Sequence, residues 1–478
     1  MNSLSPSPHH SPTVPLCVDL DGTLVATDTL WESIFLLLRK KTLLSFLLPL
    51  WLLRGRAYLK HRIAQHVKLN VATLPYRENI LEFLKREQDR GRFIILATAA
   101  HQKIAYPIAK HLRIFAEVIA SDATTNVKGT VKRDILLQRF GQFDYMGDST
   151  ADIPIFQAAR YAFLVAPNRT LLKKIPCPPH RLFPIYPITL STWLKLLRPH
   201  QWVKNVLIFL PLFLAHQFQD FQALTNAFSA FLAFSMAASA GYILNDLLDL
   251  PADRSHPTKK RRPFAAGNIP IAYGLPLFIL LVALSLSSSI YFLSLNFAGL
   301  ISSYLLLTMT YSFLLKSKMV LDVVVLAALY TFRIFAGGIA VSVGISSWLL
   351  AFSMFMFMSL AFLKRYTELL QLNHRKFVKH RDYNIEDIEM IASMGPTNGY
   401  LAVLVFALYI NSDQVGNYSS PFILWMICPP LLYWITRIWF LTHRRKMLDD
   451  PVKFALADPT SWVTVIGIII VVLLAKFL

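Results

Sequence analysis

The stretch GYILNDLLDLPADRSHPTKKRRPFAAG, residues 241–267, joins the end of an apolar run to a dense group of charges. Its acids and the cations that follow them are Asp246, Asp249, Asp253, Arg254, Lys259, Lys260, Arg261 and Arg262. Carboxylates hold hard cations, and clustered Lys and Arg bind phosphate oxygens. The stretch therefore predicts that a metal ion and a polyanion share one site at the edge of an apolar segment.

The composition of the whole chain indicates a membrane protein with a soluble part. The chain has 478 residues, of which 55% are hydrophobic, and a formal net charge of +20. It is too apolar for an ordinary soluble domain and long enough for two units. Cys17, Cys177 and Cys428 are odd in number and widely spaced, so neither a disulfide framework nor a zinc site is indicated, and a reduced cytosolic environment fits.

The N-terminal part has the pattern of a soluble α/β domain. Residues 1–14 are rich in Ser and Pro and predict a short disordered leader. Residues 15–166 alternate strand-like and helical runs, as in a parallel sheet, and we expect a helical cap at about 29–90. Residues 167–192 contain six prolines and predict a stiff, poorly helical linker.

Residues 193–478 are predicted to form an all-α membrane domain, because apolar runs there approach the ~20 residues that cross a bilayer. We expect nine spans, near 202–219, 221–244, 271–290, 293–312, 320–341, 346–364, 397–411, 421–440 and 459–477.

The basic residues of this domain are unevenly distributed between its loops. They gather in alternate loops, 245–270, 313–319, 364–381 and 437–453, whereas NSDQVGNYSS (411–420) has none. By the positive-inside tendency, the basic loops and the N-terminal domain face the cytoplasm of an inner-membrane protein, with the carboxyl terminus outside. The excess of Lys and Arg is thus explained by the cytoplasmic loops of a membrane protein, and we expect no nucleic-acid partner.

One stretch inside the expected cap is strongly apolar. TLLSFLLPLWLL, residues 42–53, is too short to span a bilayer. The cations that flank it are Arg39, Lys40, Lys41, Arg54 and Arg56. This pattern favours an interfacial segment that holds the cap against anionic lipid headgroups, and a buried cap helix is the alternative.

The acids of the opening stretch recur at helical intervals. Asn245, Asp249 and Asp253 are spaced i, i+4, i+8, so they share one face of a continuing helix with Asp246 at its edge, although Pro251 interrupts that helix. Such a face can hold Mg²⁺, which also prefers substrate phosphates. The cations expected to neutralise those phosphates are Arg254, Lys259, Arg261 and Arg262. A solvated loop whose acids and bases pair with one another is the alternative.

NDLLDLPADRSHPTKKRRPFAAG, residues 245–267, resembles the Asn-Asp-x-x-Asp-x-x-x-Asp signature of the UbiA superfamily of intramembrane prenyltransferases. RPHQWVKN (198–205), YSFLLKSKMVLDVVVLAALYTFRIFAGG (311–338) and FLKRYTEL (362–369) extend the resemblance over about 195–478, toward the polyprenyl-phosphate 5-phosphoribosyltransferase branch. Aromatic prenyltransferases of this superfamily usually carry a second motif, DxxxD, which is reduced here to Asp322 in DVVVL.

This resemblance implies an Mg²⁺-dependent transfer of 5-phosphoribosyl from phosphoribosyl diphosphate to a polyprenyl phosphate. Asn245, Asp246, Asp249 and Asp253 would hold the Mg²⁺ that polarises the leaving diphosphate. Further expected substrate-binding residues near membrane borders are Lys204, Tyr311, Lys316, Asp322, Arg333, Lys364 and Arg365. The lysines alternatively serve as snorkelling anchors, whereas Arg333 lies within a span and should meet an acid or a phosphate.

VDLDGTLVATD, residues 18–28, resembles motif I of the haloacid-dehalogenase-like (HAD) phosphohydrolases. Thr98 after RFIILAT, Lys132 in KGTVKRDIL and GDSTAD (147–152) follow in the order of that family. The resemblance implies that Asp19 attacks phosphorus and that Asp21 acts as general acid and then base. Thr98 and Lys132 would bind the phosphoryl oxygens. A second Mg²⁺ would be held by Asp19, Asp148 and Asp152.

The fusion suggests that the HAD-like domain removes the 5-phosphate of the membrane domain's product. Two alternatives stay open: a UbiA-type aromatic prenyltransferase with a fused phosphatase, and a non-enzymatic lipid carrier or transporter. Charges at the cytoplasmic side rather than at the midplane of the bilayer argue against a transporter. Lipid chain length and homo-oligomer formation are left open.

Overall fold

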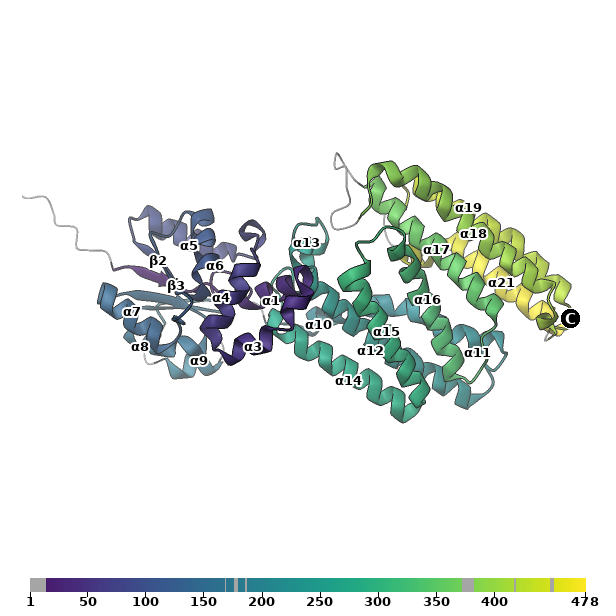
Figure 1. Ribbon diagram of the computed structural model, residues 1–478, viewed down its shortest axis with the longest axis horizontal. Helices are drawn as coiled ribbons and strands as arrows, with labels where there is room; N and C mark the ends of the chain where they lie inside the picture. Colours follow the sequence, from purple (N-terminus) through teal and green to yellow (C-terminus); the bar gives the residue numbers. More distant parts are fainter. Residues whose placement is uncertain are drawn as a thin grey trace, which may run out of the picture. The chain divides into compact units, whose positions relative to one another are not determined.

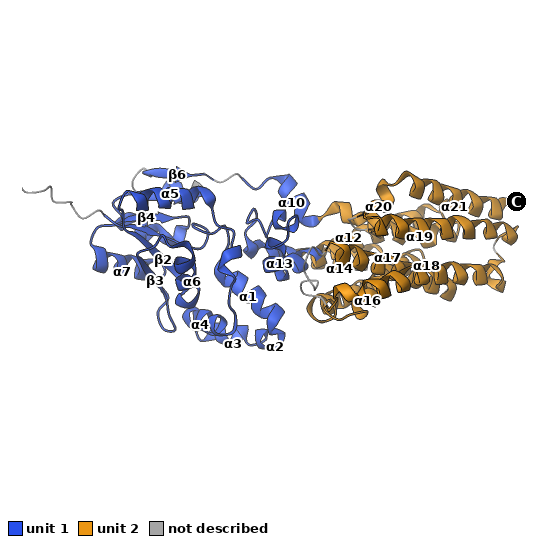
Figure 2. Ribbon diagram, turned by 90° about the horizontal axis from the view of Figure 1, so that it is seen from above, with its two compact units in different colours: residues 1–197, 242–278 blue, residues 198–241, 279–478 orange. Residues whose placement is uncertain are grey.

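The computed structural model describes residues 14–167, 169–175, 179–184, 187–371, 382–416, 418–447 and 451–478. The expected leader up to residue 13, Cys177, and residues 372–381 of one basic loop lie outside the described residues. The chain forms two compact units (Figure 2), unit 1 with residues 1–197 and 242–278, and unit 2 with residues 198–241 and 279–478.

Unit 1 contains a six-stranded sheet in the order β3-β2-β1-β4-β5-β6, and every neighbouring pair is parallel. The strands are β1 (Leu16–Val18), β2 (Ile94–His101), β3 (Glu117–Ser121), β4 (Asp144–Gly147), β5 (Ala162–Val165) and β6 (Arg181–Phe183). The helices packed around it are α5 (Glu78–Asp89), α6 (Gln102–Leu112), α7 (Thr130–Phe140), α8 (Ile153–Ala158) and α9 (Arg169–Lys174).

Both faces of the sheet are buried, which explains the continuous apolar runs of its strands. Leu16 and Val18 pack with α5 and α6 on one face, whereas Cys17 packs with α7, α8 and α9 on the other. Figure 1 shows these helices around β2 and β3. The predicted parallel α/β domain is confirmed, and this arrangement places the carboxyl ends of β1 and β4 side by side.

The sheet extends beyond residue 166, where the sequence predicted that the domain ends. Within the segment expected to be a poorly helical linker, α9 forms and β6 pairs with β5, with Leu164 opposite Leu182. Phe183 is buried in the same core as Val165. Three residues between prolines are enough for an edge strand, because such a strand needs hydrogen bonds on one side only.

The cap is smaller than the predicted range of about 29–90. It consists of α1 (Thr29–Lys40), α2 (Thr42–Ser45), α3 (Leu48–Leu53) and α4 (Arg56–His66), followed by the short helix η1 (Val71–Thr73). These helices share a core with Leu37, Trp51 and Ile63 at its centre. Helix α5 instead packs on the sheet through Ile80 and Leu84, which lie on one helical face.

The apolar stretch at 42–53 exposes most of its large side chains. Leu43 is 84% exposed, Phe46 77% and Leu53 85%, while Trp51 alone among its largest residues is buried. A contiguous exposed apolar surface of this kind marks a contact site for a membrane or another protein. The alternative of a buried cap helix therefore does not describe this stretch.

Unit 1 also includes the Asp-rich segment, which we define as residues 245–262. Helix α12 (Phe221–Leu248) ends inside it, and α13 (Leu250–Arg254) and η4 (Lys259–Arg261) follow. The backbone N–H of Asp249 donates to the carbonyl of Asn245, and that of Asp253 donates to the carbonyl of Asp249, both at 2.9 Å. Asn245, Asp249 and Asp253 therefore lie one helical turn apart, although α12 ends and α13 begins on either side of Asp249.

Unit 2 is helical. Eight helices among the described residues are long and apolar enough to cross a membrane: Phe221–Leu248, Ile271–Phe292, Leu295–Leu315, Leu321–Ala340, Ser347–Leu370, Ile385–Ile410, Pro421–His443 and Pro459–Phe477. They contain α12, α14 (Gly274–Phe292), α15 (Leu295–Thr310), α16 (Leu321–Ala340), α17 (Ser347–Leu370), α18 (Ile388–Ile410), α19 (Cys428–His443) and α21 (Pro459–Phe477). The predicted all-α membrane domain is confirmed.

The first predicted span, 202–219, is the exception. The chain there forms the 3₁₀ helix η3 (Pro199–Phe209) and then α11 (Leu210–Leu214), so the described residues contain eight candidate spans where nine were predicted. Pro211 lies at the start of α11, where its missing N–H is tolerated but a longer preceding α-helix would be broken. Two further short α-helices are α10 (Leu190–Leu197) in unit 1 and α20 (Pro451–Ala457) in unit 2.

Candidate functional site

Three aspartates meet at the carboxyl ends of neighbouring strands of unit 1. Asp19 directly follows β1 and Asp148 directly follows β4, which pairs with β1 in parallel. Asp152 ends the short helix η2 (Thr150–Asp152). One carboxylate oxygen of each aspartate lies within 4.8 Å of the other two. The structure thus brings together the residues that the motifs assign to a metal ion in this domain.

The donor set of this cluster fits Mg²⁺, which prefers carboxylate oxygens. Oδ2 of Asp152 is buried and has no hydrogen-bond partner. Burial, opposed by Lys132 and reinforced by Asp152, raises the pKa of Asp19 to about 6. Burial and the charges of Asp19 and Asp152 raise the pKa of Asp148 to about 7. A divalent cation would stabilise the ionised form of all three groups.

Lys132 is the cation of this cluster. Its side chain is 1% exposed, and Nζ donates to Oδ1 of Asp19 at 3.1 Å, to Tyr145 Oη at 2.8 Å and to Oδ1 of Asp152 at 3.4 Å. Burial alone would lower the pKa of Lys132, but the two carboxylates raise it above its usual value. The lysine is therefore charged beside the expected nucleophile, where a phosphoryl oxygen would bind.

Asp21 does not belong to the three-aspartate cluster, and its carboxylate is hydrogen-bonded to the cap instead. Its Oδ1 accepts the backbone N–H of Thr29, the first residue of α1, at 2.8 Å. Burial and the neighbouring charge of Asp28 raise the pKa of Asp21 well above its usual range. A carboxyl group whose protonated form is favoured by burial suits the predicted role of general acid.

The turn after Asp21 explains the Gly-Thr pair of the motif. Gly22 has φ +77°, and a Cβ at this position would clash with the carboxylate of Asp148. Thr23 Oγ1 donates to Oδ1 of Asp148 at 3.0 Å. Glycine therefore permits the close approach of the two loops, and Thr23 orients the carboxylate of Asp148, a contact that the motif did not predict.

Thr98 lies on β2, the neighbour of β1. Val18 is opposite Leu96, so Thr98 is one residue beyond the level of Asp19 along the sheet. It is fully buried, and its Oγ1 accepts the backbone N–H of Ala100 at 3.0 Å. The hydroxyl hydrogen is left to donate to a phosphoryl oxygen, as the motif predicts.

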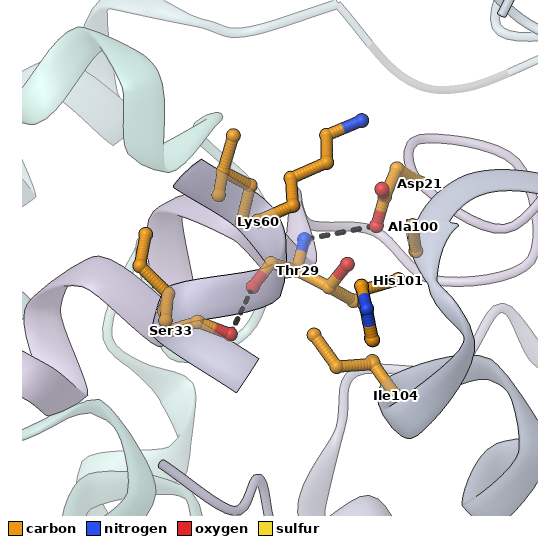
Figure 3. Close-up of a pocket in the computed structure, with 9 residues that line it drawn as sticks. Asp21, Thr29, Ser33, Lys60, Ala100, His101 and Ile104 are labelled. Atoms are coloured by element: carbon orange, nitrogen blue, oxygen red, sulfur yellow. Dashed lines mark hydrogen bonds between the residues drawn. The ribbon is translucent and has the colours of Figure 1, made fainter. Parts of the chain in front are cut away.

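A small cavity lies between the cap and the sheet (Figure 3), lined by Asp21, Thr29, Leu30, Ser33, Lys60, Ile63, Ala100, His101 and Ile104. Lys60 on α4 donates to the carbonyl of Ala99 at 2.6 Å and to Asn126 Oδ1 at 2.9 Å. Burial lowers its pKa, opposed by the charge of Asp21. The cap thereby brings a lysine into the cavity beside the expected general acid, and the sequence analysis missed it because α4 carries no recognisable motif.

In the Asp-rich segment, Arg262 joins two of the acids. Its Nη1 donates to Oδ1 of Asp246 at 3.0 Å and to Oδ2 of Asp253 at 2.6 Å, and both carboxylates are buried. Burial, opposed by Arg262, raises the pKa of Asp253. The carboxylate oxygens of Asp246 and Asp253 are ligands that a hard metal ion prefers. In this structure both carboxylates bind the guanidinium of Arg262.

Other charges of the Asp-rich segment contact the cap. Asp249 lies 3.2 Å from Nη1 of Arg39, and Arg254 pairs with both oxygens of Glu32. Arg254, predicted as a phosphate ligand, is thus held by a carboxylate. Lys259 and Arg261, on η4, are exposed and reach solvent.

In unit 2, Arg333 is buried on α16 and donates from Nε to Oδ1 of Asn205 at 2.8 Å. Asn205 in turn donates to Ser235 Oγ at 2.9 Å. The guanidinium carbon lies 5.3, 5.6 and 5.2 Å from the ring centroids of Phe234, Tyr304 and Tyr330. The predicted partner was an acid or a phosphate, whereas the structure surrounds the cation with an amide and aromatic faces, which also stabilise it.

Asp322 and Arg365, predicted separately as substrate-binding residues, form a buried ion pair at 2.7 Å. Tyr383 Oη donates to Oδ1 of Asp322 at 2.8 Å and accepts the backbone N–H of Val320 at 2.9 Å. Val320 has φ +63°, a conformation that is strained for a β-branched residue. Strain of this kind is concentrated at functional sites, and here it lies in KSKMVLD (316–322), within the stretch 311–338 that extends the resemblance to the UbiA superfamily.

The remaining predicted residues of unit 2 are Lys204 on η3, Tyr311 and Lys316 at either end of a π-helical turn, and Lys364 on α17. Tyr311 is buried and begins a π-helical turn, η6 (Tyr311–Leu315), which Lys316 follows. Lys204 on η3 lies over the ring of Tyr330, with Nζ 5.7 Å from its centroid. Lys316 and Lys364 are half-buried. Asn205, which the sequence analysis did not name, adjoins Lys204 and connects it with the surroundings of Arg333.

These observations define an integral membrane protein that carries a cluster of aspartates at the strand ends of a separate α/β domain. The model of the UbiA prenyltransferase family matches residues 206–458, and that of the haloacid dehalogenase-like hydrolases matches residues 16–157. The chain therefore belongs to the UbiA prenyltransferase family, with a HAD-like domain at its N-terminus. Both domains belong to families of enzymes.

Three relatives show which proteins the chain is similar to. Uncharacterized protein y4nM of Sinorhizobium fredii is 37% identical over 460 residues, which are 94% of this chain and 88% of that protein. Nodulation protein NoeC of Azorhizobium caulinodans is 34% identical over 59% of this chain and 92% of that protein. Decaprenyl-phosphate phosphoribosyltransferase of Mycobacterium tuberculosis is 37% identical over 37% of this chain and 59% of that protein.

Proposed function

We propose that the membrane domain transfers the 5-phosphoribosyl group of phosphoribosyl diphosphate to a polyprenyl phosphate. The observation that carries this proposal is the Asp-rich segment, where Asn245, Asp249 and Asp253 recur at one-turn intervals beside Arg262. Oxygen donors and cations together suit a diphosphate bound with Mg²⁺. The similarity to a decaprenyl-phosphate phosphoribosyltransferase supports the choice of substrates.

In the proposed reaction, a phosphate oxygen of the lipid attacks C1 of the ribose. The bond between C1 and the diphosphate oxygen breaks, and the diphosphate leaves with the electron pair. Arg262, Lys259 and Arg261 bind the phosphate oxygens, with Asp246 and Asp253 orienting Arg262. Mg²⁺ bound by the aspartates would supply further positive charge to the leaving group. The product is a polyprenyl phosphoryl-ribose that still carries its 5-phosphate.

We propose further that the HAD-like domain hydrolyses this 5-phosphate. Asp19 attacks phosphorus, Asp21 gives its proton to the departing ribose 5-oxygen, and an aspartyl-phosphate forms. Asp21 then removes a proton from water, which attacks phosphorus, and inorganic phosphate leaves as Asp19 is regenerated. Lys132 and Thr98 bind the phosphoryl oxygens during both steps, and Asp19, Asp148 and Asp152 would hold the Mg²⁺ of this domain.

A lipid-linked substrate requires that the HAD-like domain work at the membrane surface. The exposed apolar side chains of residues 42–53 and the cations around them suit the boundary between acyl chains and anionic headgroups. We therefore propose that this stretch of the cap rests on the cytoplasmic face of the inner membrane.

The transfer is tested by release of diphosphate in membranes or nanodiscs. Purified full-length protein should release diphosphate from phosphoribosyl diphosphate only when a polyprenyl phosphate and Mg²⁺ are both present. Release from a prenyl diphosphate with an aromatic acid as acceptor would instead show an aromatic prenyltransferase. Absence of metal-dependent release with either pair would favour a lipid carrier.

A further inference from the structure

Helix α1 of the cap contacts the Asp-rich segment through two ion pairs. Arg254 donates to both carboxylate oxygens of Glu32, at 2.8 and 2.6 Å. Arg39 lies 3.2 Å from Oδ1 of Asp249 and donates to the carbonyl of Leu248 at 3.3 Å. Glu32 and Arg39 are seven residues apart, which is about two helical turns, so both contacts come from one face of α1.

The first of these pairs is almost completely buried. The side chains of Arg254 and Glu32 are 6% and 4% exposed. Burying two charges costs solvation energy, so such a pair adds little to stability compared with apolar packing, but the loss of one partner leaves an uncompensated buried charge. A bidentate pair of this kind also fixes geometry, because both oxygens and both nitrogens must align.

A backbone contact supports the same alignment. Gly267, just after the Asp-rich segment, has φ +72°, and a Cβ there would lie 2.6 Å from Cβ of Ala26. Ala26 belongs to the loop between Asp21 and α1. The two segments of the chain therefore approach closely where only glycine fits, and this contact is independent of the ion pairs.

The other end of α1 reaches the phosphohydrolase site. Asp21 accepts the N–H of Thr29 at 2.8 Å, and Asp28 caps the helix by accepting the N–H groups of Leu30 and Trp31. Helix α1 has 12 residues. One short rigid element thus contacts the expected general acid of one site and the expected metal ligand of the other.

We propose that α1 positions the Asp-rich segment: Glu32 and Arg39 hold Arg254 and Asp249 in place and tie the transferase site to the phosphohydrolase site. Neither residue touches a substrate in this account, so both are positioning residues. The contact is reciprocal, since a segment held by the helix also holds the helix. The kinetic part of the inference rests on the proposed transfer reaction, whereas the part concerning mobility does not.

Hydrogen exchange of the full-length protein in nanodiscs tests the mobility directly. In Glu32→Gln, amides of residues 250–262 should exchange at least about fivefold faster than in the wild type, because the segment loses an anchor. Arg39→Gln removes the second anchor and should also accelerate exchange in residues 250–262. It carries less risk to folding, because the side chain of Arg39 is 23% exposed. Glu82→Gln is the matched control, because Glu82 pairs with Arg86 at the surface.

Kinetics separate positioning from a general loss of structure. Glu32→Gln should raise the KM for phosphoribosyl diphosphate by roughly tenfold and change kcat by no more than about twofold. In the double variant with Arg254→Gln, the KM should rise by less than the product of the two single effects. The reason is that the second substitution removes the buried charge that the first one leaves without its partner. Strictly multiplicative effects would show that the two residues do not act as a pair.

Reciprocity provides the decisive comparison. Asp249→Asn should accelerate exchange in the last turn of α1, around Arg39, by a similar factor. Unchanged exchange in residues 250–262 of Glu32→Gln and Arg39→Gln, in protein whose sheet exchanges normally, would overturn the inference. If the wild type transfers no phosphoribosyl group but the exchange results hold, the proposed reaction fails while the positioning role of α1 stands.

Discussion

The ammonium group of Lys132 donates a hydrogen bond to the carboxylate of Asp19 at 3.1 Å, and both side chains are shielded from solvent. Lys132 comes from α7 and Asp19 from the end of β1, so the fold rather than the local sequence brings them together. If Asp19 is the nucleophile that we propose, the fixed positive charge of Lys132 lies where a transferring phosphoryl group would gather negative charge. This relationship is the basis of the first prediction.

Lys132→Met should lower phosphatase activity on a soluble phosphomonoester by roughly 10² to 10³-fold, because a preorganised cation is lost from the transition state. The measurement is release of inorganic phosphate with Mg²⁺ present. Lys103→Met is the control, since Lys103 is an exposed lysine on α6. Activity of Lys132→Met within about threefold of the wild type would contradict the assignment of Lys132 to the phosphoryl site.

The stability of the metal-free HAD-like domain should fall as pH rises from about 4 to about 7. The pKa of Asp19 is raised from 3.8 to about 6 and that of Asp148 from 3.8 to about 7, so in this window the folded state binds more protons than the unfolded state. Stability then decreases with pH.

Thermal unfolding with EDTA at several pH values measures this slope. Mg²⁺ should flatten it, because a cation stabilises the ionised carboxylates. Asp148→Asn should remove part of the slope in the metal-free protein. A metal-free domain that becomes more stable between these pH values would mean that the carboxylates are not held as the structure has them.

Asp249→Asn should abolish transfer to lipid and leave hydrolysis of a soluble phosphomonoester within about twofold of the wild type. The reason is that a carboxylate charge of the proposed metal site disappears without a change of size. Asp413→Asn, at an exposed acid of unit 2, is the control. Equal loss of both activities in folded Asp249→Asn protein would show that the chain does not hold two separate catalytic sites.

The exposed apolar stretch of the cap should matter for lipid substrates alone. Phe46→Glu combined with Leu53→Glu places charges where we propose that the cap meets the membrane, and should lower hydrolysis of a lipid phosphomonoester in anionic vesicles by about tenfold. Hydrolysis of p-nitrophenyl phosphate should be unaffected. Tyr106→Glu, at an exposed residue of α6, controls for added surface charge. Equal effects on both substrates would argue that the stretch has a structural role.

The sequence predicted the two domains well because their patterns are local. The strand RFIILAT and its neighbours are apolar on both faces, as buried parallel strands must be, and the long apolar runs of the membrane domain need no tertiary information. Strand β6 was missed because its three residues lie among prolines and acquire their conformation only by pairing with β5. The first expected span is not one long α-helix in the structure, because hydropathy does not register the change from 3₁₀ to α-helix before Pro211.

Site residues could be predicted from the sequence where a motif specifies them. They could not be predicted where only a contact between distant parts of the sequence brings them to the site. Asp19, Asp148 and Asp152 follow from strand ends in a known order, and the structure brings them within reach of one ion. Glu32 has no motif, and its partner Arg254 lies 222 residues away in the sequence. Such contacts depend on how the cap is placed, which single-sequence patterns do not encode.

The most direct test of the account uses doubly labelled phosphoribosyl diphosphate, with radiocarbon in the ribose and radiophosphorus in the 5-phosphate. Full-length protein in nanodiscs is incubated with this substrate, a polyprenyl phosphate and Mg²⁺, and both labels are counted in the lipid extract. Asp19→Asn and Asp249→Asn are assayed in parallel, because each removes one of the two proposed activities.

The account predicts that the wild type moves radiocarbon into the lipid and releases radiophosphorus as inorganic phosphate. Asp19→Asn should carry both labels into the lipid in equal molar amounts, since it transfers but does not hydrolyse, and Asp249→Asn should carry neither. Absence of radiocarbon from the lipid of the wild type would contradict phosphoribosyl transfer. Retention of both labels by the wild type at long times would contradict the coupling of the two domains.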